Sequence, residues 1–170
     1  MDSAISQIAK KHELKMHLDG ARIFNALVES GDSSQEYGKY FDTISVCFSK
    51  GLGAPVGSVL LFKEQYAKPA HRLRKILGGG MRQGGYLAAA AIHALENHIP
   101  LLKKDHERAK VLEATIKTLP FVAEVMPVDT NILIFKLAGS ITAKTCLEKL
   151  KEKGILAVPF GPQEVRFVTH

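Results

Sequence analysis

The chain has 170 residues, of which 46% are hydrophobic, 24% charged and 7% aromatic. This composition is typical of globular proteins and excludes disordered and fibrous ones. Lysine and arginine number 23 against 17 acidic residues, which gives a formal charge of +6. Acidic residues interrupt the basic ones and no basic run is interleaved with aromatic residues, so we expect anionic small ligands rather than nucleic acid.

The cysteines and the N-terminus indicate the compartment. Cys47 and Cys146 lie in apolar segments without a CxxC or histidine-bearing spacing, which predicts core thiols in a reducing compartment and no metal site. No segment approaches the ~20 apolar residues of a membrane span. Residues 1–15 lack the basic patch and apolar run of a signal peptide. We therefore expect a cytoplasmic protein without membrane contact.

The first forty residues alternate between helical and extended patterns. Apolar side chains at helical spacing predict a first helix that ends near Glu13, and a short strand follows at residues 15–19. Residues 21–30 return to a helical period. Residues 31–39, GDSSQEYGK, are polar and rich in turn formers, and we predict a loop there.

The next segment contains the clearest strand. Residues 43–49, TISVCFS, predict a strand buried on both faces, and residues 57–62 predict another after the GLGAPV loop. Strand, helix, strand in this order is a βαβ unit, whose right-handed crossover makes the strands parallel. Asp19 and Lys50 would then both lie at the carboxyl edge, where open α/β sheets bind ligands.

Lys50 and Asp19 are the residues that could carry chemistry. An amine at the end of a buried strand can form a Schiff base, although a surface lysine just past a strand is the alternative. A carboxylate such as Asp19 keeps the ring nitrogen of pyridoxal phosphate protonated, so that the ring withdraws electrons from a substrate. Gly20 and Ala21 leave room for a flat ring, and Arg22 could reach an anionic oxygen. Taken singly, Asp19 could be a helix cap and Arg22 a salt-bridge partner.

A glycine run follows the predicted strands. Gly78 to Gly80 turn the chain and are not followed by the GK[ST] of a phosphate-binding P-loop. A long helical region from about Met81 to Leu119 has a break near Pro100. From Pro120 the predicted order is strand, strand, helix, strand, strand, which is an α+β pattern (VAEVM, NILIFK, ITAKTCLEKLKEK, ILAVPF, EVRFV). We place a domain boundary near residue 98.

Four blocks of sequence resemble the threonine aldolases, pyridoxal phosphate enzymes of the aspartate aminotransferase superfamily. They are HLDGARIFNA, SVCFSKGLGAPVGS, RKILGGGMRQGGYLAAAAIHAL and VRFVTH, in that order and with fitting spacings. The resemblance implies an α/β fold in which residues 1–97 are the C-terminal portion of the cofactor-binding catalytic domain. Residues 98–170 are then the small α+β domain.

The resemblance also assigns roles to single residues. Lys50 in SKGLGAP resembles the lysine that binds the cofactor covalently, and Asp19 in HLDGAR the carboxylate paired with the pyridine nitrogen. Arg22 is similar to the arginine near the cofactor's phenolic oxygen. Arg166 in VRFVTH resembles the arginine that binds the substrate carboxylate with two parallel hydrogen bonds. Lys75 and Arg82, which flank the glycines, resemble a basic pair that meets phosphate or substrate near a subunit interface, although they could be surface cations of a helix.

The implied activity is a carbon–carbon lyase. The cofactor accepts electrons when the β-hydroxyl proton of L-threonine or L-allo-threonine is removed and the Cα–Cβ bond breaks, leaving glycine and an aldehyde. The sequence does not identify the base. His17 shares a strand face with Asp19 and either supports the site or is a half-buried, hydrogen-bonded histidine. Four other histidines are expected on helix or loop surfaces and are assigned no role (His71, His93, His98, His106).

Length separates this chain from the family that it resembles. Threonine aldolases are considerably longer, and the N-terminal half that holds the cofactor phosphate has no counterpart here. We therefore expect a homo-oligomer, dimer or tetramer, or a complex with a complementing N-terminal half, because a sheet cut at a strand exposes unpaired backbone and apolar faces. The alternatives are a catalytically silent oligomerisation module, and an aminotransferase or β-eliminating lyase of the same superfamily.

Overall fold

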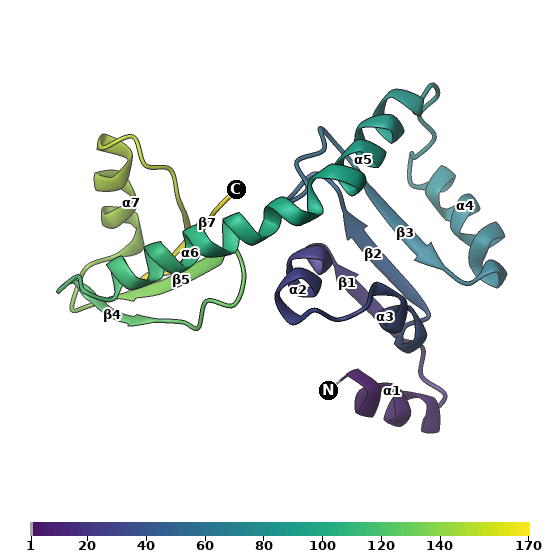
Figure 1. Ribbon diagram of the computed structural model, residues 1–170, viewed down its shortest axis with the longest axis horizontal. Helices are drawn as coiled ribbons and strands as arrows, with labels where there is room; N and C mark the ends of the chain where they lie inside the picture. The colour runs from purple at the N-terminus through teal and green to yellow at the C-terminus, as the bar shows by residue number, and fades with distance from the viewer. Residues whose placement is uncertain (1) are drawn as a thin grey trace. The chain divides into compact units, whose positions relative to one another are not determined.

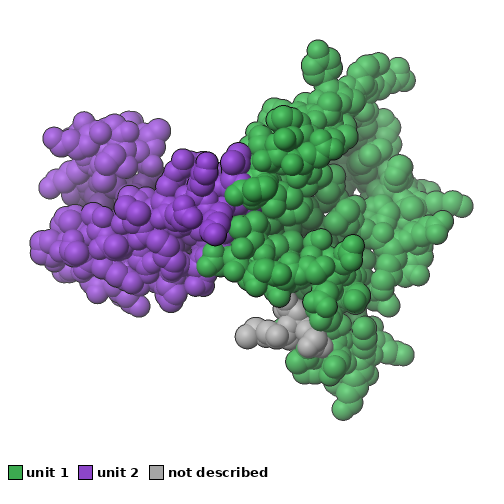
Figure 2. All heavy atoms as spheres, in the orientation of Figure 1, with its two compact units in different colours: residues 1–100 green, residues 101–170 purple. Residues whose placement is uncertain are grey.

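The computed structural model describes residues 2–170, and the chain divides into two compact units (Figure 2). Unit 1 is residues 1–100 and unit 2 is residues 101–170. Each unit has a β-sheet and helices of its own (Figure 1).

Unit 1 is built around a three-stranded sheet. Its first elements are α1 (Asp2–Lys11), β1 (His17–Gly20), α2 (Ile23–Ser30), α3 (Ser34–Tyr40), β2 (Thr43–Cys47) and β3 (Ser58–Phe62). The strand order is β1-β2-β3, and β1 runs parallel to β2, as the predicted βαβ unit requires. β3 pairs antiparallel with β2, so that β1 and β3 both form sheet edges.

One predicted loop is a helix. The sequence predicts a polar loop at residues 31–39, whereas α3 occupies most of that stretch. Ser33 starts the helix, because its hydroxyl accepts a hydrogen bond from the backbone N–H of Gln35 at 3.2 Å. α3 also contacts α1, where the buried hydroxyl of Ser6 donates to the carbonyl of Tyr40 at 3.3 Å. The prediction is wrong because the helix depends on this cap and this contact rather than on an apolar period.

The central strand β2 is buried on one face only. Ile44 and Val46 are buried, whereas Thr43, Ser45 and Cys47 on the opposite face are half-buried. The predicted burial on both faces is therefore wrong, since the alternating hydroxyl side chains belong to a more open face. Strands β1 and β2 approach each other closely at Gly20, where an added Cβ would lie 2.7 Å from the carbonyl oxygen of Ser45.

The remainder of unit 1 is helical. After β3 come a short 3₁₀ helix (Glu64–Tyr66), α4 (Ala67–Ile76) and α5 (Gly85–Asn97). The glycine run turns the chain after α4, and Gly79 donates to the carbonyl of Arg74 at 2.8 Å. The helical break predicted near Pro100 is confirmed, because α5 ends and a 3₁₀ turn (Ile99–Leu101) precedes the next helix.

Unit 2 is a four-stranded antiparallel sheet with two helices. Its elements are α6 (Leu102–Ile116), β4 (Val122–Val125), β5 (Ile132–Leu137), α7 (Ala143–Glu152), β6 (Val158–Gly161) and β7 (Glu164–Val168). The strand order is β4-β5-β7-β6, and every neighbouring pair is antiparallel. The predicted order of strands and helix after Pro120 is confirmed.

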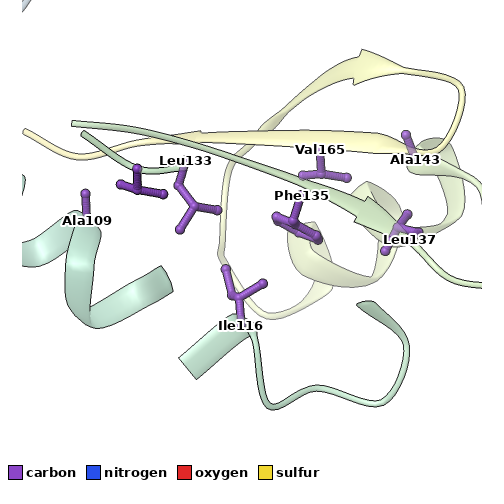
Figure 3. Packing of buried hydrophobic residues seen from close by; sticks show 8 residues of the cluster. Ala109, Ile116, Leu133, Phe135, Leu137, Ala143 and Val165 are labelled. Carbon is purple, nitrogen blue, oxygen red and sulfur yellow. The ribbon is translucent and has the colours of Figure 1, made fainter. Parts of the chain in front are cut away.

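The core of unit 2 lies between one sheet face and its helices (Figure 3). Leu133, Phe135 and Leu137 alternate along β5 and point to this face, and Val165 of β7 joins them. The rings of Phe135 and Phe167 meet edge to face, with 5.4 Å between their centroids. The helices contribute three further members of the cluster (Ala109, Ile116, Ala143).

No helix within residues 2–170 combines the length and the apolar character that crossing a bilayer requires.

Candidate active site

The carboxyl ends of β1 and β2 bring the two principal candidates to one sheet edge. Asp19 is the third residue of β1 and pairs in register with Ser45 of β2. Lys50 follows the end of β2 at Cys47 by three residues. Because the two strands are parallel and adjacent, both residues lie at the carboxyl ends of this strand pair, as the βαβ pattern predicts.

Asp19 lies on the more open face of the sheet. Its side chain is exposed, and Oδ1 accepts a hydrogen bond from the backbone N–H of Ala21 at 3.2 Å, which bends the chain between β1 and α2. Oδ2 makes no hydrogen bond to any residue in the described part of the chain. One carboxylate oxygen is thus used to fix the side chain, and the other is available for a protonated ring nitrogen.

The surface beside Asp19 is polar. His17 lies two residues earlier on the same strand face, and its Nδ1 is 2.7 Å from the Oγ1 of Thr43 on β2. His17 is exposed, so the expectation that it is half-buried is wrong, although its hydrogen bond is as expected. The hydroxyl of Ser45 donates to the carbonyl of Leu18 at 3.5 Å. This sheet face therefore offers a histidine and hydroxyl groups next to the carboxylate.

Lys50 begins a tight turn. The backbone N–H of Gly53 donates to its carbonyl at 2.9 Å, and Gly53 has a φ of 67°, which favours glycine. The Lys50 side chain is half-buried, and its amine has no hydrogen bond or ion pair with the residues that the structure describes. An amine in this state is available for covalent chemistry, because no carboxylate competes for it.

Two arginines have a buried nitrogen without a partner. Arg22 precedes α2, and its Nε is buried without a hydrogen bond within residues 2–170. Arg166 lies on β7 in unit 2, paired in register with Ile134 and Val158 on the sheet face opposite the core. Its Nε is also buried and without a partner in the described residues. A buried guanidinium nitrogen of this kind requires a hydrogen-bond acceptor, and an anionic ligand would supply one.

The basic pair around the glycine run is exposed. Lys75 lies in the last turn of α4, and its Nζ would be 3.1 Å from a Cβ placed on Gly80. Gly80 has a φ of 157°, and the glycine therefore allows both this backbone and the close approach of the amine. Arg82 follows on the exposed segment before α5. The structure gives neither side chain a hydrogen bond or ion pair in its described part.

Two histidines differ from the sequence expectation. His106 is buried in α6 rather than on a surface. His98, which follows α5, lies against the Lys50 turn, with 2.6 Å between its Nδ1 and the carbonyl oxygen of Leu52. No motif marks His98, and its place two residues before Pro100, where the sequence predicts a helix break, is the feature that sets it apart.

Solved structures share the fold of this chain. The mixed α/β architecture matches solved enzymes of the aminotransferase type, including a pyridoxal phosphate-dependent aminotransferase from Streptococcus suis, with a TM-score of 0.70 at 16% identity over 97% of this chain and 46% of the other. A threonine aldolase from Leishmania major gives a TM-score of 0.78 at 22% identity over 97% of this chain and 49% of the other. The predicted fold class is confirmed.

The sequence then identifies the family. The model of the beta-eliminating lyase family matches residues 3–140, and the chain belongs to this family. A low-specificity L-threonine aldolase from Arabidopsis thaliana is 40% identical over 169 residues, 98% of this chain and 47% of the relative. Its Escherichia coli K12 counterpart is 42% identical over 166 residues, 96% of this chain and 48% of the relative. The chain thus spans about half the length of these curated relatives.

The candidate site residues of this chain fit pyridoxal phosphate, the cofactor of this family and of its aminotransferase-like neighbours. Among the described residues, nothing pairs with the second carboxylate oxygen of Asp19, the amine of Lys50 or the buried Nε of Arg22. All three belong to the segment from β1 to the turn after β2. Within residues 2–170, no three histidine, cysteine or acidic side chains gather as metal ligands would.

Proposed function

We propose that this chain supplies the lysine and carboxylate side of a pyridoxal phosphate site that cleaves L-threonine or L-allo-threonine to glycine and an aldehyde. The single observation that supports the proposal best is the pair of Asp19 and Lys50 at one edge of a parallel strand pair, each with a free polar atom. When bound, the cofactor supplies an electron sink for the bonding pair released from the Cα–Cβ bond.

Some of these residues would bind the cofactor and others the substrate. Lys50 would bond the cofactor's aldehyde carbon, and Asp19 would hold a proton on the ring nitrogen through its free oxygen. Arg22 would face the phenolic oxygen. Arg166 would bind the substrate carboxylate, which would use its unpartnered nitrogen. Lys75 and Arg82 are exposed cations that suit a phosphate or carboxylate, and we propose them as further binding residues.

The division of the chain into two compact units supports two domains. We propose residues 1–97 as the C-terminal portion of the catalytic domain and residues 98–170 as the small domain. The free thiols of Cys47 and Cys146 support a reducing, cytoplasmic compartment.

We also propose that the chain associates, as a dimer or tetramer or with a complementing N-terminal half. The edge strand β3 supports this, because Val59, Leu60 and Leu61 are all exposed although they alternate between the two faces of the sheet. Tyr86 on the alanine-rich helix α5 is 93% exposed and Ile92 is 54% exposed. This surface equally favours the second candidate function, an oligomerisation module without catalysis.

The first test is covalent capture. The purified chain is incubated with pyridoxal phosphate, the visible absorbance is recorded, borohydride is added, and the added mass is located by peptide mapping. We expect modification mainly at Lys50, loss of that modification in Lys50→Ala, and no change in the matched variant Lys68→Ala, since Lys68 is an exposed lysine of α4. Labelling scattered over surface lysines would contradict the proposal.

The second test separates the activities. Threonine is supplied to the assembly that binds the cofactor, and release of glycine and acetaldehyde is measured. Conversion of the cofactor to its aminated form by an amino acid would favour an aminotransferase. Full aldehyde release by Lys50→Ala would exclude the proposed mechanism. Sedimentation of the chain without cofactor tests association, and a monomer that binds little apolar dye would argue against the oligomerisation module.

A further inference from the structure

The turn that begins at Lys50 is held from outside by one side chain. The Nδ1 of His98 lies 2.6 Å from the carbonyl oxygen of Leu52, the third residue of that turn. A carbonyl oxygen only accepts hydrogen bonds, so Nδ1 carries the proton and donates it. The contact therefore fixes His98 with a proton on Nδ1, in the neutral or in the charged ring.

The turn itself is short and internally bonded. Gly53 donates its N–H to the Lys50 carbonyl at 2.9 Å, and the Ala54 N–H donates to the Phe48 carbonyl at 3.0 Å. The Leu52 residue is 2% exposed, which anchors the middle of the turn in the core of unit 1. The Leu52 carbonyl is thus a buried acceptor whose loss of a donor would leave it unsatisfied.

His98 is itself held in place. Its backbone N–H donates to the carbonyl of Ala94 at 2.9 Å, which continues the hydrogen bonding of α5 by one residue. Its ring meets the ring of His93 edge to face, with 5.3 Å between the centroids. Asn97 in turn donates to the His93 carbonyl at 2.8 Å. The imidazole that reaches the turn is thus fixed by the end of a helix.

We propose that His98 is a positioning residue for Lys50, acting through the Leu52 carbonyl. This inference rests on the proposed function, because the position of the Lys50 amine matters only if that amine binds the cofactor. A reacting group must be held within about 0.5 Å of its productive position, and residues around it provide that restraint. Without the His98 hydrogen bond, the turn samples other conformations and the amine is oriented for only part of the time.

Three variants test the contact. His98→Leu removes the donor, whereas His98→Asn keeps one, because the asparagine Nδ2 occupies nearly the place of the ring Nδ1. His71→Leu is the matched control, since His71 is an exposed histidine of α4 that makes no hydrogen bond or ion pair within the described residues. The readouts are the ¹⁵N shifts of the imidazoles, the hydrogen exchange of the Gly53 and Ala54 amides without cofactor, and the rate at which pyridoxal phosphate and borohydride modify Lys50.

We expect the ¹⁵N shifts of the wild-type chain to show a protonated Nδ1 at His98. Exchange of the Gly53 amide should accelerate about tenfold in His98→Leu, which corresponds to the loss of one hydrogen bond. Modification of Lys50 should slow by a similar factor. His98→Asn should restore both rates to within about threefold of the wild type, and His71→Leu should leave both unchanged. If His98 only stabilised the fold as a whole, His98→Asn would not selectively restore the exchange rates of the turn amides.

The outcomes separate the two proposals. If the wild-type chain is modified at Lys50 and His98→Leu is modified equally fast, the inference about His98 fails and the proposed function stands. If the wild-type chain shows no preference for Lys50, the proposed function fails and the inference fails with it. If His98→Leu does not fold, the wild-type ¹⁵N shifts decide, because a ring protonated only at Nε2 would overturn the inference.

Discussion

Asp42 accepts a hydrogen bond from the backbone N–H of Met16, with 3.0 Å between Oδ2 and the nitrogen. The Asp42 N–H in return donates to the Met16 carbonyl at 2.8 Å. This reciprocal pair joins the residue before β2 to the residue before β1, and so sets the start of the parallel strands. The hydrogen bond from Met16 is the main reason that the pKa of Asp42 is below its ordinary value of 3.8, and Lys63, 3.4 Å away, adds to the effect.

The first prediction is a pH-dependent stability. Because the pKa of Asp42 is lowered on folding, ionised Asp42 stabilises the folded chain above pH ~4, and this contribution is lost as the pH falls through the folded pKa. Asp42→Asn should therefore reduce the free energy of unfolding at pH 7 by about 1 kcal/mol. Urea unfolding at pH 7 and below pH ~3 provides the measurement. An equal difference between the two proteins at both pH values would contradict the prediction.

The second prediction concerns Gly20. An alanine there would place its Cβ 2.7 Å from the Ser45 carbonyl oxygen, and backbone must shift to relieve the contact. We expect Gly20→Ala to destabilise the chain by about 1–3 kcal/mol. Gly38 is the matched control, because it lies within α3 with no atom within 4 Å of an added Cβ. Gly38→Ala should stabilise by about 0.5–1 kcal/mol, and thermal unfolding measures both changes.

The third prediction concerns the core of unit 2. Leu133 is 1% exposed and packs in the cluster between the sheet and its helices, so Leu133→Ala should cost about 2–5 kcal/mol. Leu156 is 82% exposed, and Leu156→Ala should change the free energy of unfolding by less than about 0.5 kcal/mol. Comparable losses in the two variants, measured by denaturant unfolding, would refute the packing described for β5.

The fourth prediction concerns a thiol. Burial raises the pKa of Cys146 above its ordinary value of 9.0, and nearby Lys149 only partly opposes this. The thiolate is the reactive form, so alkylation of Cys146 should be slow at pH 7 and should accelerate about tenfold for each pH unit up to pH ~9. Mass spectrometry of iodoacetamide-treated peptides follows the rate. The same thiol in urea is the control, and equal rates in the folded and unfolded chain would show that burial has no effect.

Much of the fold could be predicted from the sequence. The β-branched run of β2 and the helical period of α2 specify the βαβ unit, and the parallel pairing that brings Asp19 and Lys50 to one edge follows from it. The prediction of β2 succeeds because a β-branched apolar run is typical of a strand, and that of α2 because its apolar residues recur at helical spacing.

The remaining features depend on single contacts. α3 begins at one serine cap and has no apolar period, so its pattern reads as a loop. His98 reaches the Leu52 carbonyl across 46 positions of sequence, and a single histidine gives no signal of such a contact. The pattern of β2 wrongly predicts burial on both faces, because a hydroxyl-rich strand face can lie against a helix or on an open surface.

The division of the chain at Pro100 has a consequence for inheritance. Asp19, Arg22, Lys50 and His98 all precede that division, whereas Arg166 follows it. A recombination event at this point would exchange the residue proposed to select the carboxylate end of a substrate while it retained every residue proposed at the cofactor end. Such an exchange would alter how the substrate carboxylate is bound and would leave unchanged the residues proposed to hold the reactive amine.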